Sequence, residues 1–161
     1  MLSISYSQAL NDPTYCEDGV AHGRALAKRL GVKHNQPYPL KDILPYCTIP
    51  EFLWCLRAVK VSQKAEADEF ANAFVHKVLL PLGWGSLADL ARQNGAYTMP
   101  EKVTLEDRVK FKLVHTLTSR LSPSQAAIDI SKAVVYYIGQ SGGNMVEEEQ
   151  RQRKILKGLL Q

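Results

Sequence analysis

The chain of 161 residues has few cysteines and histidines. It contains only three cysteines, Cys16, Cys47 and Cys55, and none forms a Cys-x-x-Cys pair. The four histidines are scattered, and no two lie three or four residues apart. We therefore expect no metal site and no bound cofactor.

Long apolar runs are also missing. No run approaches the ~20 residues that a membrane-spanning helix needs. The first residues lack the basic start and long apolar block of a secretory signal. An odd number of unclustered cysteines is typical of a reducing compartment. We expect a cytoplasmic protein without a membrane partner.

Recognisable catalytic motifs are absent as well. The sequence GWGS, Gly83 to Ser86, differs from the G-x-S-x-G of a nucleophile elbow, and we interpret Ser86 as a helix cap. The glycines of QSGG, Gln140 to Gly143, precede a helix that opens with acids, which would repel phosphate. The sequence thus indicates a protein that is not an enzyme. A cleft near Trp84 or His115 is the enzymatic alternative.

Helical periodicity is present along nearly the whole chain. It predicts an all-α fold, a single-domain helical bundle of about six to seven helices. We expect residues 1–141 to form the helical domain, and residues 144–161 to form a C-terminal helix that docks on it or binds a partner. The expected helices cover residues 18–30, 48–60, 62–80, 86–93, 104–121 and 122–138, followed by the C-terminal helix. Only residues 2–6 resemble a strand.

Several of these helices have clear start signals. The pairs Thr48 with Glu51, Ser86 with Asp89, and Thr104 with Asp107 have the three-residue spacing of a capping box. Ser122 and Asn144 are residue types that favour the N-cap position. We expect a helix to begin at each of these positions.

Positive charge is concentrated in the segment from Arg108 to Leu121. At 100° per residue its apolar residues fall on one side of a helix and its basic residues on the other. The apolar side comprises Val109, Leu113, Val114, Leu117 and Leu121, and the opposite side comprises Arg108, Lys112, His115 and Ser119. No Asp or Glu occurs between Arg108 and Ile128. This pattern favours contact with phosphates.

A second basic stretch runs from His22 to Lys41, also without an acid, and contains Arg24, Lys28 and Arg29. A solvated helix face also carries Lys and Arg, and that simpler interpretation stays open. Two basic stretches without interspersed acids favour binding to nucleic-acid backbone, read by shape and charge. The candidate nucleic-acid-binding residues are Arg24, Lys28, Arg29, Arg108, Lys112 and His115.

The segment EADEFANAFVHKVLLPLGWGSLADLARQNG, Glu66 to Gly95, resembles the helical C-terminal region of large subunits in Cascade-type CRISPR effector complexes. The whole chain, helical and mildly basic with a formal charge of +4, resembles their small subunit. The resemblance implies a helical subunit without an active site, which supports the guide-target duplex and the displaced strand through basic surface residues. Its partners would be RNA or single-stranded DNA and other protein subunits.

A different class of function is also compatible with this sequence. Small helical chains without a catalytic site often act by covering a partner, as toxin-immunity proteins and phage-encoded inhibitors do. The acidic clusters, Glu66 to Glu69 and Glu147 to Glu149, could face a basic partner. A protein-binding antagonist is therefore the alternative hypothesis.

Overall fold

The computed structural model describes residues 1–5, 17–33 and 36–161, without the side chains of residues 17–20 and 22. Cys16, His34 and the imidazole of His22 lie outside the described residues. The described part is a single helical domain with eight α-helices and one two-stranded sheet. The predicted all-α class is confirmed. The expected six to seven helices were too few, because the proline-rich segment after the first helix contains a four-residue helix.

In chain order the α-helices are α2 (Glu17–Leu30), α3 (Leu40–Ile43), α4 (Ile49–Cys55), α5 (Lys64–Leu79), α6 (Gly85–Arg92), α7 (Leu105–Thr118), α8 (Pro123–Gln140) and α9 (Met145–Leu159). The 3-10 turns are η1 (Leu44–Tyr46), η2 (Leu56–Ala58), η3 (Val61–Gln63) and η4 (Leu80–Leu82). Strand β1 (Ser3–Ile4) pairs antiparallel with β2 (Tyr38–Pro39), with Ser3 opposite Pro39.

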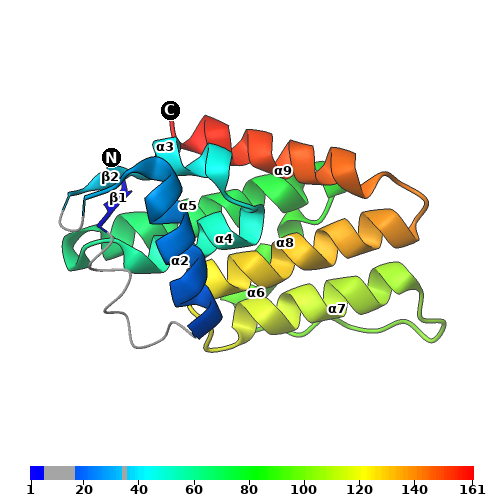
Figure 1. The fold of residues 1–161 in the computed structure, drawn as a ribbon. Coiled ribbons are helices and arrows are strands. Elements are labelled where there is room, and N and C mark those ends of the chain that lie inside the picture. Colours follow the sequence, from blue (N-terminus) through cyan, green and yellow to red (C-terminus); the bar gives the residue numbers. More distant parts are fainter. Residues whose placement is uncertain (6–16, 34–35) are drawn as a thin grey trace.

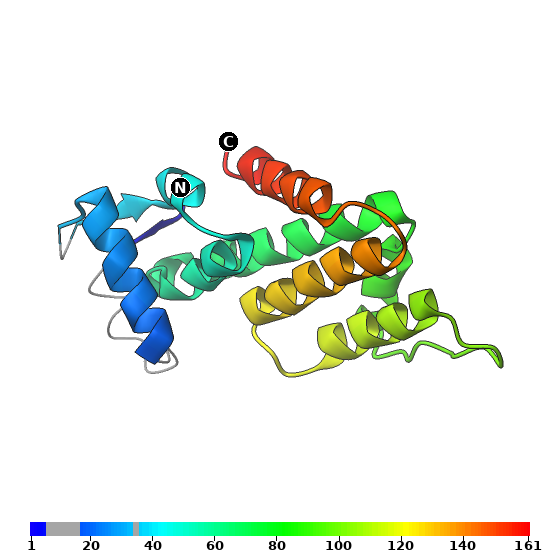
Figure 2. The same cartoon turned by 45° about the vertical axis from the view of Figure 1, so that its right-hand side comes forward.

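Helices α7, α8 and α9 lie side by side, and α8 is in the middle (Figures 1 and 2). Helices α4 and α5 pack against α8, and α6 packs against α7. Helix α2 stands at one end of the molecule, where Leu26 and Leu30 pack against the core. Phe52, Phe74, Leu113 and other core residues are fully buried between these helices.

Most of the expected helix starts are confirmed. Thr48 and Thr104 each form a complete capping box, and Ser122 and Asn144 accept hydrogen bonds from backbone N–H groups of the first turn. The expected cap at Ser86 was wrong. Helix α6 already begins at Gly85, because the left-handed Gly83 turns the chain there.

Two expected helices were too long. The helix predicted over 48–60 ends at Cys55 and continues as η2, because Val59 is drawn into an antiparallel bridge with Ile4. The basic helix ends at Thr118, where Ser119 takes an extended conformation. Leu121 therefore lies outside the apolar face and is 44% exposed.

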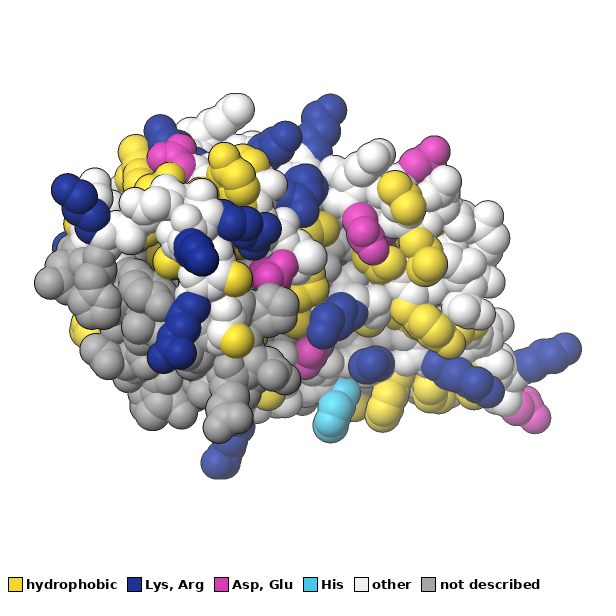
Figure 3. Space-filling view, in the orientation of Figure 1, with side chains coloured by type: hydrophobic (Ala, Val, Ile, Leu, Met, Phe, Trp, Pro, Cys, Tyr) yellow, Lys and Arg dark blue, Asp and Glu magenta, His cyan; other side chains and the backbone are white. Residues whose placement is uncertain are grey.

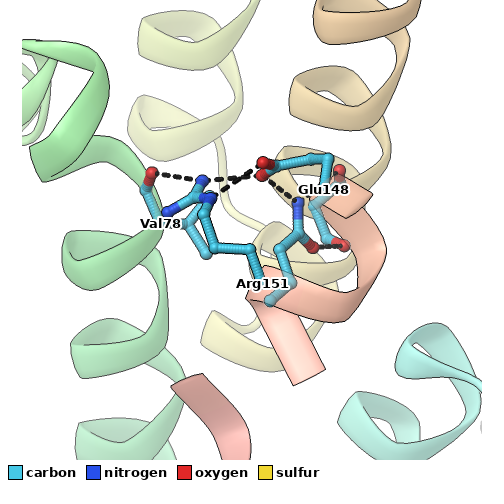
Figure 4. Close-up of polar contacts among 5 residues, drawn as sticks. Val78, Glu148 and Arg151 are labelled. Atoms are coloured by element: carbon cyan, nitrogen blue, oxygen red, sulfur yellow. Dashed lines mark hydrogen bonds and ion pairs between the residues drawn. The ribbon is translucent and has the colours of Figure 1, made fainter. Parts of the chain in front are cut away.

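Helix α9 is held to the bundle by a buried polar network, drawn in Figure 4. The carboxylate of Glu148 accepts two hydrogen bonds from Arg151, at 2.6 and 2.8 Å, and one from Gln152 at 3.1 Å. Arg151 also donates to the carbonyl oxygen of Val78 in α5, and the hydroxyl of Ser131 in α8 donates to Gln152. Because buried polar groups are costly without partners, the network fixes the position of α9 on α5 and α8.

We expect Arg151→Ala to lower the free energy of unfolding by about 2–3 kcal/mol, because it leaves the buried carboxylate of Glu148 without its cation. This loss of stability is smaller than the loss expected for a fully buried ion pair, because the Arg151 side chain is 30% exposed. Urea unfolding measures the effect. The control Lys157→Ala, at an exposed position of the same helix, should change stability by less than about 0.5 kcal/mol. Equal stabilities of Arg151→Ala and wild type would contradict the assigned role.

Candidate nucleic-acid interface

Helix α7 is amphipathic in the way that its sequence predicts. Val109, Leu113 and Val114 are buried against the core. Arg108, Lys112 and His115 are all exposed. The inner residues therefore fix the helix, and the basic residues point to solvent.

The first acid of α7, Glu106, is paired within the protein. Its carboxylate lies 3.1 Å from the ammonium of Lys110 and accepts a hydrogen bond of 3.1 Å from the indole N–H of Trp84. The contact with Lys110, followed by that with Trp84, lowers the pKa of Glu106 below its ordinary value. Lys110 also lies 5.8 Å from the centre of the Trp84 ring. Glu106 thus neutralises Lys110, a base that is only partly exposed.

The second acid, Asp107, is also occupied. It accepts a hydrogen bond of 2.7 Å from the phenol of Tyr97, and further hydrogen bonds from the N–H and hydroxyl groups of Thr104. The Tyr97 contact is the largest of the causes that lower the pKa of Asp107, and the same contact raises the pKa of Tyr97. Both first-turn acids therefore have local partners.

The outer face of α7 carries a contiguous stripe, which we call the α7 stripe: Arg108, Phe111, Lys112 and His115. The spacing of i, i+3, i+4 and i+7 places these side chains on one side of the helix. Phe111 is 46% exposed, and its ring is parallel to the imidazole of His115 within 2°, with centroids 6.4 Å apart. None of the three basic residues of the stripe has a carboxylate partner among the ion pairs of the described residues.

The three basic candidates on α2, namely Arg24, Lys28 and Arg29, are exposed as well. Figure 3 shows Lys and Arg side chains over α2 and along α7 on one face of the molecule, with some acidic side chains between the two groups. The two basic regions therefore face the same side, and among the described side chains they are separated by acidic ones. We place the main candidate interface on α7.

Sequence reasoning missed Phe111 as a member of the stripe. A phenylalanine at helical spacing is usually part of a core, and only the position of α7 on the bundle shows that this one faces outward. The signal for Phe111 was its position, i+3 from Arg108 and i−4 from His115. Sequence reasoning also missed the contact of Glu106 with Trp84, because Trp84 lies 22 residues away in the sequence. The ion pair of Glu106 with Lys110 did have a local signal, the i,i+4 spacing.

We also searched the described ranges for a metal site, a catalytic cleft and a membrane-spanning helix. No group of three or more His, Cys, Asp or Glu side chains there is arranged to hold a metal ion. Trp84 and His115, the two positions considered for a catalytic cleft, are respectively buried and exposed on the surface. No described helix is both long and apolar enough to cross a membrane.

We expect Tyr97→Phe to raise the pKa of Asp107 toward its ordinary value, because the variant has no phenol hydroxyl to donate a hydrogen bond. The pKa of Asp107 is lowered in the folded state, so its stabilising effect is present above the unfolded pKa and is lost as the pH falls through the folded pKa. The stability gap between wild type and variant should therefore narrow on acidification. Carboxyl-carbon NMR titration measures the pKa, and an unchanged value would contradict the assignment.

Comparison of the chain with protein families, with curated proteins and with solved structures finds no match. The case for a function therefore rests on the geometry of the chain itself, in which the α7 stripe joins unpaired positive charge to an exposed aromatic ring.

Proposed function

We propose that the protein is a non-enzymatic helical subunit that binds the backbone of single-stranded nucleic acid along the α7 stripe, within a ribonucleoprotein assembly. The observation that carries the proposal is that Arg108, Lys112 and His115 are exposed on α7. The two acids of the first turn of α7, Glu106 and Asp107, already have other partners. Unpaired Lys and Arg at a surface gain free energy by displacing counterions from phosphates.

The dimensions of the stripe fit a short length of nucleic acid. From Arg108 to His115 the helix rises by about 10 Å, which is close to the rise of about three nucleotides of one strand. Helix α7 contains no Asn or Gln, the side chains that pair with adenine edges. The stripe therefore suits recognition of charge and shape rather than of sequence.

The aromatic pair favours a single strand over a duplex. Phe111 and His115 place two parallel rings beside the cations Arg108 and Lys112, and unpaired bases stack on exposed aromatic rings. The bases of a duplex are already stacked on each other and cannot use these rings. RNA or the displaced strand of a Cascade-like complex, which the sequence resembles, would offer such bases. Free Cys47 and Cys55 are consistent with a cytoplasmic setting.

We expect the double charge reversal Arg108→Glu with Lys112→Glu to weaken binding of a labelled oligothymidine at least tenfold at low salt. The slope of log K against log salt should become shallower by roughly 0.7 for each phosphate that the variant no longer neutralises. The matched control is Lys77→Glu with Lys154→Glu, the same charge change on α5 and α9, which should bind as the wild type does. Equal losses of affinity in both variants, or no binding by the wild type at low salt, would refute the proposal.

Binding to one co-purifying protein without nucleic acid would favour the antagonist hypothesis.

Phe111→Ala tests the aromatic part of the stripe without changing its charge. We expect it to weaken oligothymidine binding by about tenfold, within the range of roughly 1–3 kcal/mol measured for stacking of one base. Binding to a duplex of the same length should stay nearly constant, and so should the salt slope. Fluorescence anisotropy measures both affinities. An equal loss of affinity for single strand and duplex would show that Phe111 does not stack on bases.

A further inference from the structure

A second surface feature lies on other elements than the α7 stripe. An open groove of about 580 Å³ runs between α9 and the junction of α5 with η4. Its lining from α9 includes Lys154, Ile155, Gly158 and Leu159, and its opposite wall includes Lys77 and Pro81. We call this feature the α5–α9 groove. Its interior is apolar and its edges are basic.

Three basic residues line this groove, and only one of them is paired within the described part of the protein. Arg151 also lines it, but its guanidinium is held by Glu148 and by the carbonyl oxygen of Val78, as Figure 4 shows. Lys77 and Lys154 are exposed and have no partner among the ion pairs of the described residues. The groove therefore offers two unpaired cations, one from each wall.

Gly158 faces the open part of the groove. A Cβ atom built at this position has no heavy atom within 4 Å. The space beside Gly158 is thus open, and a side chain at this position could begin to fill the groove without a clash at its Cβ atom.

The lining of the α9 wall has helical spacing. Residues 151, 154, 155, 158 and 159 follow i, i+3, i+4, i+7 and i+8, and they extend over about 12 Å of the helix axis. The apolar part of this lining, Ile155, Gly158 and Leu159, covers about one turn, and the cations Arg151 and Lys154 extend it by another turn. A helix face of this kind with a second wall beside it is the geometry in which a groove receives an amphipathic helix. The shape therefore suits a helical segment better than a compact ligand.

We propose that the α5–α9 groove binds an acidic amphipathic helix of a partner protein. The apolar side of that helix would pack on Ile155, Leu159 and Pro81, and its carboxylates would pair with Lys77 and Lys154. The apolar interior favours this partner over a nucleic acid, and the unpaired lysines favour an acidic helix over a neutral or basic one. The proposal goes beyond nucleic-acid binding, because it assigns a protein-binding surface on different helices.

The test uses the whole chain and two labelled synthetic peptides of about fifteen residues, a length at which an isolated helix becomes marginally stable. The first peptide has a leucine stripe with glutamates elsewhere, and the second has lysines in place of the glutamates. We expect only the acidic peptide to bind. Lys77→Glu with Lys154→Glu should weaken its binding at least tenfold, and Arg108→Glu with Lys112→Glu should leave it unchanged.

The variant Gly158→Leu tests the proposal by placing a bulky side chain in the groove. It fills the groove while leucine raises helix propensity, so the variant should be at least as stable as the wild type and should bind the acidic peptide at least tenfold more weakly. Urea unfolding verifies that the variant is folded.

Four results would overturn the proposal. These are no binding of the acidic peptide, equal binding of the basic peptide, unchanged binding by the Gly158→Leu variant, and loss of oligothymidine rather than peptide binding when Lys77 and Lys154 are reversed. A fifth such result would come from sedimentation. If the wild type is a dimer and the Gly158→Leu variant is a monomer, a second copy of the chain occupies the groove.

Discussion

The pairing of the first-turn acids of α7 with their own neighbours determines what the rest of that helix can bind. Glu106 is held by a lysine one turn on and by a buried indole, and Asp107 is held by Tyr97 and by the N-cap residue. These contacts fix the start of the helix and satisfy both carboxylates. Neither acid is then needed to compensate Arg108 or Lys112, which remain available to an external anion.

The position of α9 depends on a different kind of interaction. Its network around Glu148 is polar and buried, and the guanidinium of Arg153 adds hydrogen bonds to the carbonyl oxygens of Leu44 and Cys47. Hydrogen bonds of this kind specify one arrangement, whereas an apolar seam tolerates sliding. With α9 fixed in this way, part of its apolar stripe stays uncovered beside α5. The groove is thus a consequence of how the helix is docked.

The sequence predicted those features that depend on local signals. The helix starts at Thr104 and Ser122 follow from cap residues, and the exposure of Arg108 and Lys112 follows from helical periodicity. Features that depend on contacts between distant residues could not be predicted in this way. The bridge of Val59 with Ile4 and the groove both arise from contacts between distant parts of the chain, which a single sequence does not encode in any short pattern.

The central claim is that α7, rather than the overall positive charge, provides the nucleic-acid surface. The most direct test is NMR mapping of backbone amides during titration with oligothymidine. The account predicts that the largest shift changes occur around Arg108, Phe111, Lys112 and His115, and that amides of the α5–α9 groove change little. Changes spread evenly over all exposed lysines and arginines, or centred on α9, would contradict it.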